Sequence, residues 1–167
     1  MLRTVTEKTT FPAAAVRVRE GDLLDALPRA FRALVAMGAR ADEAEDAVQD
    51  AAVRALGSTR TIERIDGWLF VVAVRIWRGR RVRDRLVRPI EWFRGSTPGP
   101  DPVRVTLLGE LARLPERQRQ VMVARYVLGL SQKETATTLG IAQGTVTATQ
   151  AQATRRLRLR LGDNDER

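Results

Sequence analysis

Carboxylates are the side chains of this sequence that come closest to a catalytic or metal-binding arrangement. The 167 residues include neither histidine nor cysteine, which excludes serine–histidine and cysteine–histidine nucleophiles, imidazole or thiolate metal sites, and disulfides. The densest acidic cluster is Asp42, Glu43, Glu45, Asp46 and Asp50. Asp46 and Asp50 share a helical face and two carboxylates can hold a hard cation, but no acidic group elsewhere completes such a site. An acidic helix start that complements the helix dipole explains the cluster better, so we expect no enzyme activity, no metal and no cofactor.

A second pattern, between Leu130 and Arg156, is typical of a helix-turn-helix. Ser131 and Glu134 form a capping box, in which the hydroxyl and the carboxylate each accept from an orphaned amide at a helix start. Gly140 can supply the positive φ that ends this helix, and a second helix can open near Gly144. The pair is either a plain helical hairpin in a core or a DNA-binding motif, and the charge balance favours DNA.

The second helix of this motif has an apolar stripe, because Val146, Ala153 and Leu157 recur at spacings of seven and four. This stripe leaves other faces for reading DNA, and we expect the outward side chains to be Thr145, Thr149 and Gln152.

Positive charge is concentrated in two blocks of the chain, whose formal net charge is +9. Residues 1–66 hold 10 basic and 11 acidic side chains, whereas residues 67–105 and 106–161 each hold 9 basic and 3 acidic ones. Two basic blocks indicate two contacts with a polyanion. Nearly all of the cations are arginine, so a codon bias with a solvated surface is the alternative explanation. The longest uninterrupted apolar run, Trp68–Val74, is too short to cross a bilayer, and we expect a soluble, cytoplasmic protein.

Apolar periodicity predicts an all-α fold of two small helical domains joined by a flexible proline-rich linker. The expected parts are a loose arm over 1–20, a first domain over 21–88, a linker over 89–105, a helix-turn-helix domain over 106–162 and a tail over 163–167. Within the first domain we expect a helix over Leu23–Met37, broken or started at Pro28, one capped by Asp42 and one capped by Asp66.

The helix predicted from Gly67 to about Arg85 changes character along its length. Its first half is apolar and must pack in a core. Its second half carries arginines that emerge into solvent or onto phosphate, namely Arg75, Arg78, Arg80, Arg81, Arg83 and Arg85.

Taken in order, these motifs resemble a bacterial extracytoplasmic-function (ECF) sigma factor of the sigma-70 family. The resemblance covers roughly residues 22–161. It consists of Ala44-Glu45-Asp46-Ala47-Val48-Gln49-Asp50, Gly67-Trp68-Leu69, an arginine-rich helix end, a proline-rich linker, Leu114-Pro115-Glu116-Arg117-Gln118-Arg119 and the helix-turn-helix.

The resemblance implies a region 2-like front domain that binds the clamp of core RNA polymerase and melts the promoter. It assigns polymerase binding to Glu45, Asp46, Gln49, Asp50 and Arg54. It assigns contact with the displaced DNA strand to Arg75, Trp77, Arg78, Arg80, Arg81 and Arg83. We expect Trp77 to stack on unpaired bases and Trp68 to lie in the core.

For the rear, the resemblance implies a region 4-like domain that meets the polymerase flap and reads the upstream promoter element. The candidate DNA-binding residues are Lys133, Thr145, Thr147, Thr149, Gln150, Gln152, Arg155 and Arg156, with further phosphate contacts from Arg158 and Arg160. Many members of the family are also held by an anti-sigma factor, which is a further candidate partner.

Two departures from the family pattern bear on function. Arg75 and Gly79 stand where the melting helix usually carries Asn and Asp. In the reading helix, cations are replaced by Thr147, Thr149 and Gln152, and an apolar inward residue is replaced by Gln150. We expect a weaker or altered upstream preference, with Gln150 or Gln152 able to pair with adenine. The alternative is a sigma-like regulator that binds DNA without directing initiation.

Overall fold

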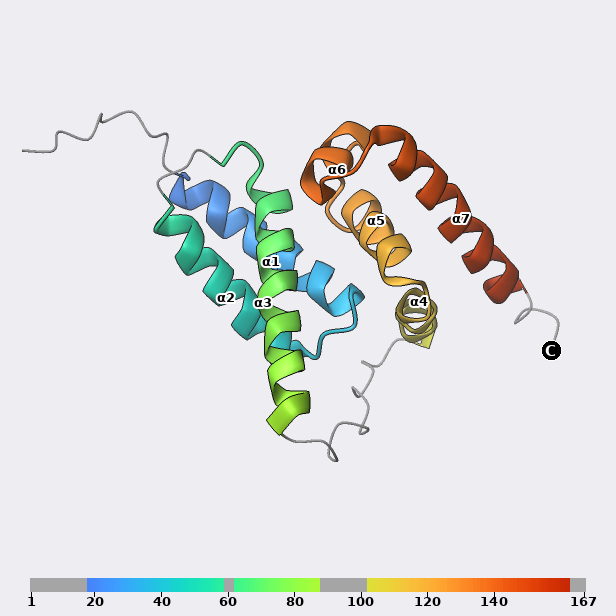
Figure 1. The fold of residues 1–167 in the computed structure, drawn as a ribbon, viewed down its shortest axis with the longest axis horizontal. Coiled ribbons are helices and arrows are strands. Elements are labelled where there is room, and N and C mark those ends of the chain that lie inside the picture. The colour runs from blue at the N-terminus through green and yellow to red at the C-terminus, as the bar shows by residue number, and fades with distance from the viewer. Residues whose placement is uncertain (1–17, 59–61, 88–101, 163–167) are drawn as a thin grey trace, which may run out of the picture.

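The computed structural model describes residues 18–58, 62–87 and 102–162, and every regular element within them is a helix (Figure 1). The helices are α1 (Glu20–Ala36), α2 (Ala41–Leu56), α3 (Ile65–Val87), α4 (Pro102–Ala112), α5 (Glu116–Tyr126), α6 (Gln132–Leu139) and α7 (Gln143–Gly162). The predicted all-α fold is confirmed. The arm, most of the linker and the tail lie outside the described residues. No helix in the described part of the chain is long and apolar enough to cross a membrane.

Helices α1, α2 and α3 form one group, the front bundle, in which each helix packs on the other two (Figure 1). Small residues make up much of the buried faces of α1 and α2. The larger buried side chains come from α3, with Leu69 and Phe70, and from the end of α1, with Leu34 and Met37. The alanines buried in this bundle include Ala26, Ala30 and Ala33 on α1 and Ala44, Ala47, Ala51 and Ala55 on α2.

The expected break at Pro28 is wrong, because α1 runs from Glu20 to Ala36 with Pro28 inside it. Proline removes one amide donor, and the carbonyl four residues earlier, that of Leu24, loses its helical partner. The side chains of Leu24 and Pro28 are both exposed, so this part of the helix faces water, which can hydrate the carbonyl. Burial of the opposite face on both sides of the proline holds the helix continuous.

Two expected caps are also wrong. The cap of α2 is made by Glu43, whose carboxylate accepts the Arg40 amide at 2.9 Å, while Asp42 points outward and pairs with the Arg40 guanidinium at 3.3 Å. Asp66 lies inside the first turn of α3 and accepts the Arg29 Nε at 2.7 Å instead of capping the helix. Asp42 and Asp66 thus pair with arginine side chains instead of capping the helices at which they lie.

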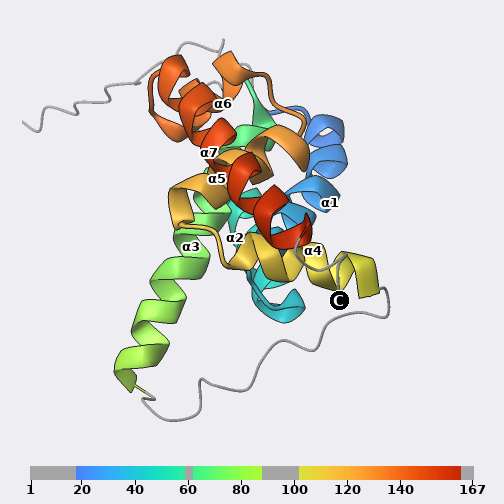
Figure 2. The ribbon, with the colours of Figure 1, turned by 90° about the vertical axis from the view of Figure 1, so that its right-hand side faces the viewer.

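Helices α4 to α7 form a second group, the rear bundle, in which α7 lies along α5 and reaches α4 (Figure 2). Its apolar contacts gather in two small clusters, one of Leu111, Leu114, Met122, Ala153 and Leu157 and one of Val121, Ala136 and Val146. α4 begins at Pro102, four residues earlier than expected, and proline at a first helical position is common.

The helix-turn-helix prediction is confirmed in its local geometry. Glu134 N donates to Ser131 Oγ at 3.2 Å, and Ser131 N donates to the Glu134 carboxylate at 2.7 Å. Gly140 adopts the left-handed conformation with φ of 63°, which ends α6 and turns the chain into α7. Val146 and Ala153 are fully buried on the inner face of α7, as their spacing predicted.

The front and rear bundles are packed against each other rather than standing apart (Figure 1). Val123, Ala124, Leu128 and Leu130, from α5 and the turn after it, belong to the same buried cluster as the side chains of α1, α2 and α3. The sequence predicted separate helical cores, and did not reveal this shared one.

Candidate nucleic-acid interface and acidic docking face

The five residues assigned to polymerase binding all lie on α2, on the side turned away from the alanine core. Glu45, Gln49 and Arg54 are exposed, and Gln49 Nε2 donates to Glu45 Oε1 at 3.4 Å. The two aspartates have a partner on α3, since Arg80 pairs with Asp50 at 2.5 Å and with Asp46 at 3.7 Å. The acidic face is therefore partly neutralised by an arginine that the sequence assigned to DNA.

The same face of α2 continues into exposed apolar side chains that the sequence interpretation missed. Val53 is 69% exposed and Leu56 is 60% exposed, one turn apart at the end of the helix. A surface that joins carboxylates to apolar side chains suits a protein partner and disfavours phosphate. The missed signal was the apolar pair at three-residue spacing beyond the acidic string.

The arginines assigned to strand contact on α3 differ in their surroundings. Arg75 and Arg83 are exposed. Arg78 pairs with Glu116 of α5 at 2.5 Å, and Arg80 pairs with α2 as above. Arg81 lies over the Trp77 ring, with 5.0 Å between the guanidinium carbon and the ring centroid. The side chain of Arg85 lies outside the described residues.

Trp77 is buried, so the expectation that it stands ready to stack on a base is wrong. It is 5% exposed, and its Nε1 donates to the Glu43 carboxylate of α2 at 3.1 Å. Trp68, which was expected in the core, is only partly buried. It lines a groove of about 730 Å³ between α3 and α6, together with Val71, Arg75 and Lys133 among others. Of these two tryptophans, Trp68 is the one beside open space.

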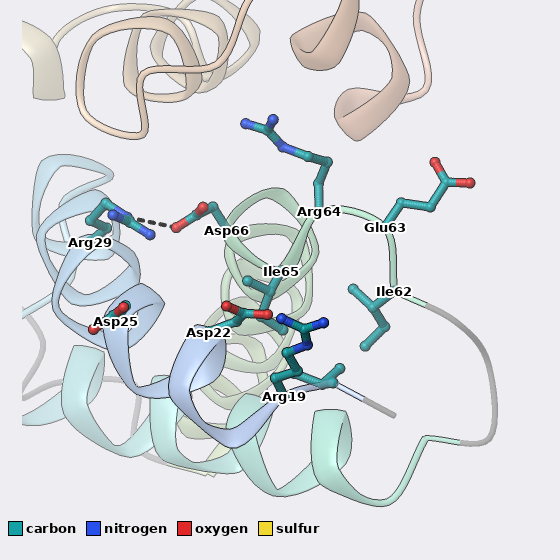
Figure 3. A pocket seen from close by; sticks show the side chains of 10 residues that line it. Arg19, Asp22, Asp25, Arg29, Ile62, Glu63, Arg64, Ile65 and Asp66 are labelled. Carbon is teal, nitrogen blue, oxygen red and sulfur yellow. Dashed lines mark hydrogen bonds and ion pairs between the residues drawn. The ribbon is translucent and has the colours of Figure 1, made fainter. Parts of the chain in front are cut away.

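A second cavity, of about 440 Å³, lies where the start of α1 meets the start of α3 (Figure 3). Its rim is charged with both signs, and the Arg29–Asp66 pair, 2.7 Å long, closes one side. Arg64 belongs to the same rim and reaches toward the rear bundle. No group of three or more ligating side chains suited to a metal ion occurs among the described residues.

The outward face of α7 carries most of the residues assigned to duplex DNA. Exposed side chains on the motif are Lys133 of α6 and Thr145, Thr147, Gln152, Arg155 and Arg156 of α7. Thr147 Oγ1 donates to the Gln143 carbonyl at 3.2 Å, a bond within the helix. Gln152 Oε1 accepts from Gln118 Nε2 at 3.4 Å. Arg160 pairs with the buried Glu110 of α4 at 3.6 Å. Arg155 and Arg156 are therefore better placed than Arg160 to contact phosphate.

Thr149 was expected on the outward face, and that expectation is wrong. It is 9% exposed and lies on the buried side of α7 with Val146 and Ala153. A residue three positions after Val146 and four before Ala153 falls on their stripe.

Gln150 lies between α7 and α5 and has both ends of its amide occupied. Its Oε1 accepts from Arg125 Nε at 3.2 Å, and its Nε2 donates to the Tyr126 hydroxyl at 2.8 Å. Arg125 Nη1 also donates to the Leu130 carbonyl. A paired contact with adenine would require Gln150 to give up both bonds, which leaves Gln152 as the better candidate.

Two ionisable groups at the junction of the bundles have shifted pKa values. The Ser131 amide and hydroxyl, followed by the charge of Arg64, hold the pKa of Glu134 below its usual value. Burial lowers the pKa of Arg119, although a guanidinium remains charged. Both groups are therefore ionised near neutral pH.

The chain is similar to known proteins over most of the described part. Residues 111–159 match the family model described as "Sigma-70, region 4". The chain is 34% identical over 128 residues to the ECF RNA polymerase sigma factor SigM of Mycobacterium tuberculosis, a match that covers 72% of this chain and 65% of that protein. It is 27% identical over 135 residues to the ECF RNA polymerase sigma factor EcfG of Rhodopseudomonas palustris, with 75% of each covered.

A solved structure shares the fold. The sigma factor RpoE of Bartonella quintana, in complex with the anti-sigma factor NepR, superposes with a TM-score of 0.71 at 24% identity, covering 85% of this chain and 95% of that chain.

Proposed function

We propose that this chain is a member of the ECF group of the sigma-70 family and that it is an initiation subunit of bacterial RNA polymerase. In this role it binds the core enzyme and directs it to particular promoters. It acts as a binding protein rather than an enzyme, in the bacterial cytoplasm. The matched part spans about two thirds of the SigM relative, 65% of its length.

The observation that carries the proposal is the separation of two kinds of surface on one chain. α2 presents an acidic and apolar face, whereas α7 presents hydroxyl, amide and guanidinium groups. The first repels phosphate and suits a protein, while the second suits a duplex groove and its backbone. A subunit that joins a polymerase to a promoter needs both.

We assign roles to these surfaces as follows. The α2 face, from Glu45 to Arg54, binds the polymerase clamp, and residues 106–162 form the domain that meets the flap. α3 holds the displaced strand with Arg75 and Arg83, and Trp68 is the better base-stacking candidate because it borders the groove. α7 reads the upstream element with Thr145 and Gln152.

The test is run-off transcription on a library of genomic fragments, with the purified chain and core polymerase. We expect transcripts that start at defined sites and disappear when the chain is omitted. Glu45→Arg, on the exposed α2 face, is expected to abolish co-elution with core polymerase, while Glu20→Arg, at an exposed position of α1, retains it. Absence of transcripts from every fragment would contradict the proposal.

A second candidate function is a sigma-like regulator that binds DNA and does not direct initiation. The observation in its favour is that the first turns of α7 carry threonine, alanine and glutamine and no cation before Arg155. In this case the chain would shift a promoter fragment in a gel without core polymerase and yield no run-off product. A further candidate partner is an anti-sigma factor, since the RpoE relative was solved in complex with one.

A further inference from the structure

The two glutamines of α7 that contact α5 differ in what their amides leave free. Gln150 has both amide atoms bonded, to Arg125 Nε at 3.2 Å and to the Tyr126 hydroxyl at 2.8 Å. Gln152 is bonded at one atom, since its Oε1 accepts from Gln118 Nε2 at 3.4 Å. An amide oxygen has two lone pairs and an amide nitrogen two hydrogens. With respect to the described residues, Gln152 therefore keeps one acceptor and two donor positions for a ligand.

Gln118 holds the Gln152 amide from a buried position on α5. The side chain of Gln118 is 7% exposed, whereas Gln152 is exposed. Met122, one turn after Gln118, packs with Ala153 and Leu157 of α7. Gln118 thus lies on the face by which α5 contacts α7. An exposed amide is joined at its oxygen to a side chain that the packing of α5 on α7 keeps in place.

The fold alone does not account for an amide at position 118. Gln118 Oε1 is buried and has no hydrogen-bond partner among the described residues. A buried acceptor without a partner lowers stability, and an apolar side chain of the same length would avoid this loss. Gln120, two positions later, differs because its amide bonds to Glu116 and Arg117 on its own helix. Within the described part of the chain the Gln118 amide bonds to Gln152 alone, which points to a role in placing that side chain.

The groups that Gln152 leaves free match the edge of one base in the major groove. Adenine offers N6–H as a donor and N7 as an acceptor, and a glutamine amide can meet both at once. Guanine offers two acceptors and would use the Gln152 nitrogen only. A glutamine loses rotamer freedom when it makes such a paired contact, and one that is already held by Gln118 loses less.

We propose that Gln118 is a positioning residue, which holds the Gln152 amide for a paired contact with adenine in the upstream promoter element. This inference rests on the proposed function, because it requires α7 to enter the major groove of promoter DNA. Gln118 does not touch the base and acts through the Gln152 oxygen. Base selection by α7 therefore depends on a buried side chain of α5.

The first experiment measures base preference with the chain bound to core polymerase. A promoter fragment from the run-off test is randomised over its upstream part, and the bound and unbound pools are sequenced. Gln152→Ala identifies the position that Gln152 reads, where we expect the native chain to prefer adenine by about tenfold. Gln118→Met, which keeps the side-chain length and removes the amide, should weaken this preference by about threefold or more. Gln120→Met, the matched control on the same helix, should leave it unchanged.

Each other result of this experiment has a definite meaning. An adenine preference that survives Gln118→Met in full would overturn the proposal. The same holds if Gln152→Ala alters no preference, or if the base preferred at the position it identifies is not adenine. If the native chain directs polymerase to no fragment, the proposed function fails and the adenine contact fails with it. Whether Gln118 positions Gln152 is then decided by the next measurement alone.

The second experiment requires neither polymerase nor DNA. Nuclear magnetic resonance relaxation of the isotope-labelled chain measures the mobility of the Gln152 side-chain amide. We expect Gln118→Met to lower the order parameter of this amide, while Gln120→Met leaves it unchanged. Equal mobility of the Gln152 amide in the native and Gln118→Met chains would overturn the proposal whatever the function of the chain.

Urea denaturation of the same chains separates positioning from a role in packing. Gln118→Met removes a buried acceptor that has no partner, so the variant should be at least as stable as the native chain. Stability that is kept while Gln152 becomes mobile is the result expected of a positioning residue. A large loss of stability in Gln118→Met would assign Gln118 to the core and overturn the proposal.

Discussion

Helices α3 and α7 are both rich in arginine, yet they hold their cations in different surroundings. On α3, Arg78 and Arg80 pair with carboxylates of α5 and α2. On α7, Arg155 and Arg156 are exposed. From the sequence alone the two helices look equally suited to bind phosphate, because both are rich in arginine. Whether a cation is available to a phosphate depends instead on which carboxylates the neighbouring helices place within reach.

The largest expected effect tests the buried part of α3. Trp77→Ala removes a ring that is 5% exposed and its bond to Glu43, so the free energy of unfolding should fall by about 3–5 kcal/mol. Urea denaturation followed by circular dichroism measures it, and Trp68→Ala, at a partly buried position, should cost less. A Trp77→Ala chain of unchanged stability that fails only to open promoters would restore the stacking interpretation.

The exposed arginines of α7 predict a smaller effect, on duplex binding. Loss of Arg155 and Arg156 to alanine should make the plot of log affinity against log salt shallower by about 1.8, if each cation contacts one phosphate. Fluorescence anisotropy on one promoter duplex at several salt concentrations measures the slope. The matched double change of Arg78 and Arg80 to alanine should leave this slope unaltered. If it reduced the slope as much as the α7 change does, the proposed difference between α3 and α7 would be wrong.

Two threonines of α7 allow an exposed and a buried position of one helix to be compared. Thr147→Lys adds a cation to the exposed face and should steepen the salt slope by about 0.9. Thr149→Arg places a cation at a position that is 9% exposed, so it should lower the unfolding midpoint without strengthening DNA binding. The same anisotropy and denaturation measurements decide, and stronger binding by Thr149→Arg would show that the inner face of α7 is misassigned.

The smallest effect concerns pH. Because Ser131 and then Arg64 lower the folded-state pKa of Glu134, its ionised form stabilises the folded state above the ordinary glutamate pKa. This contribution is lost as pH falls through the lowered value. The stability difference between the native chain and Glu134→Gln should therefore be full at neutral pH and shrink in acid. A difference that stays constant from neutral pH to pH of about 3 would contradict the assignment.

Much of the fold was predictable from local patterns. The capping box of Ser131 and Glu134 and the positive φ of Gly140 need only residues a few positions apart, and both are as expected. The buried face of α3 also had a local signal that was overlooked. Phe70, Ala73, Val74 and Trp77 repeat at helical spacing, which places Trp77 inside with the others.

The remaining features depend on residues far apart in the sequence. Arg80 meets Asp50 across 30 positions, and Arg119 meets Met37 across 82. No periodicity encodes such partners, because each arises from where two helices cross. The partial neutralisation of the acidic face of α2 and the packing of the two bundles could therefore not be predicted from the sequence. The site assignments taken from the resemblance stay predictions.

The buried alanines of α1 and α2 have a consequence for the α2 face. Alanine has no χ rotamers, so the packed methyl groups lose almost no side-chain entropy on folding and offer no alternative packing afterwards. A core that contains many such groups holds its helices in place, since any larger residue would overfill it. Substitutions can thus change the chemistry of the outward side chains of α2 while their positions in space stay constant.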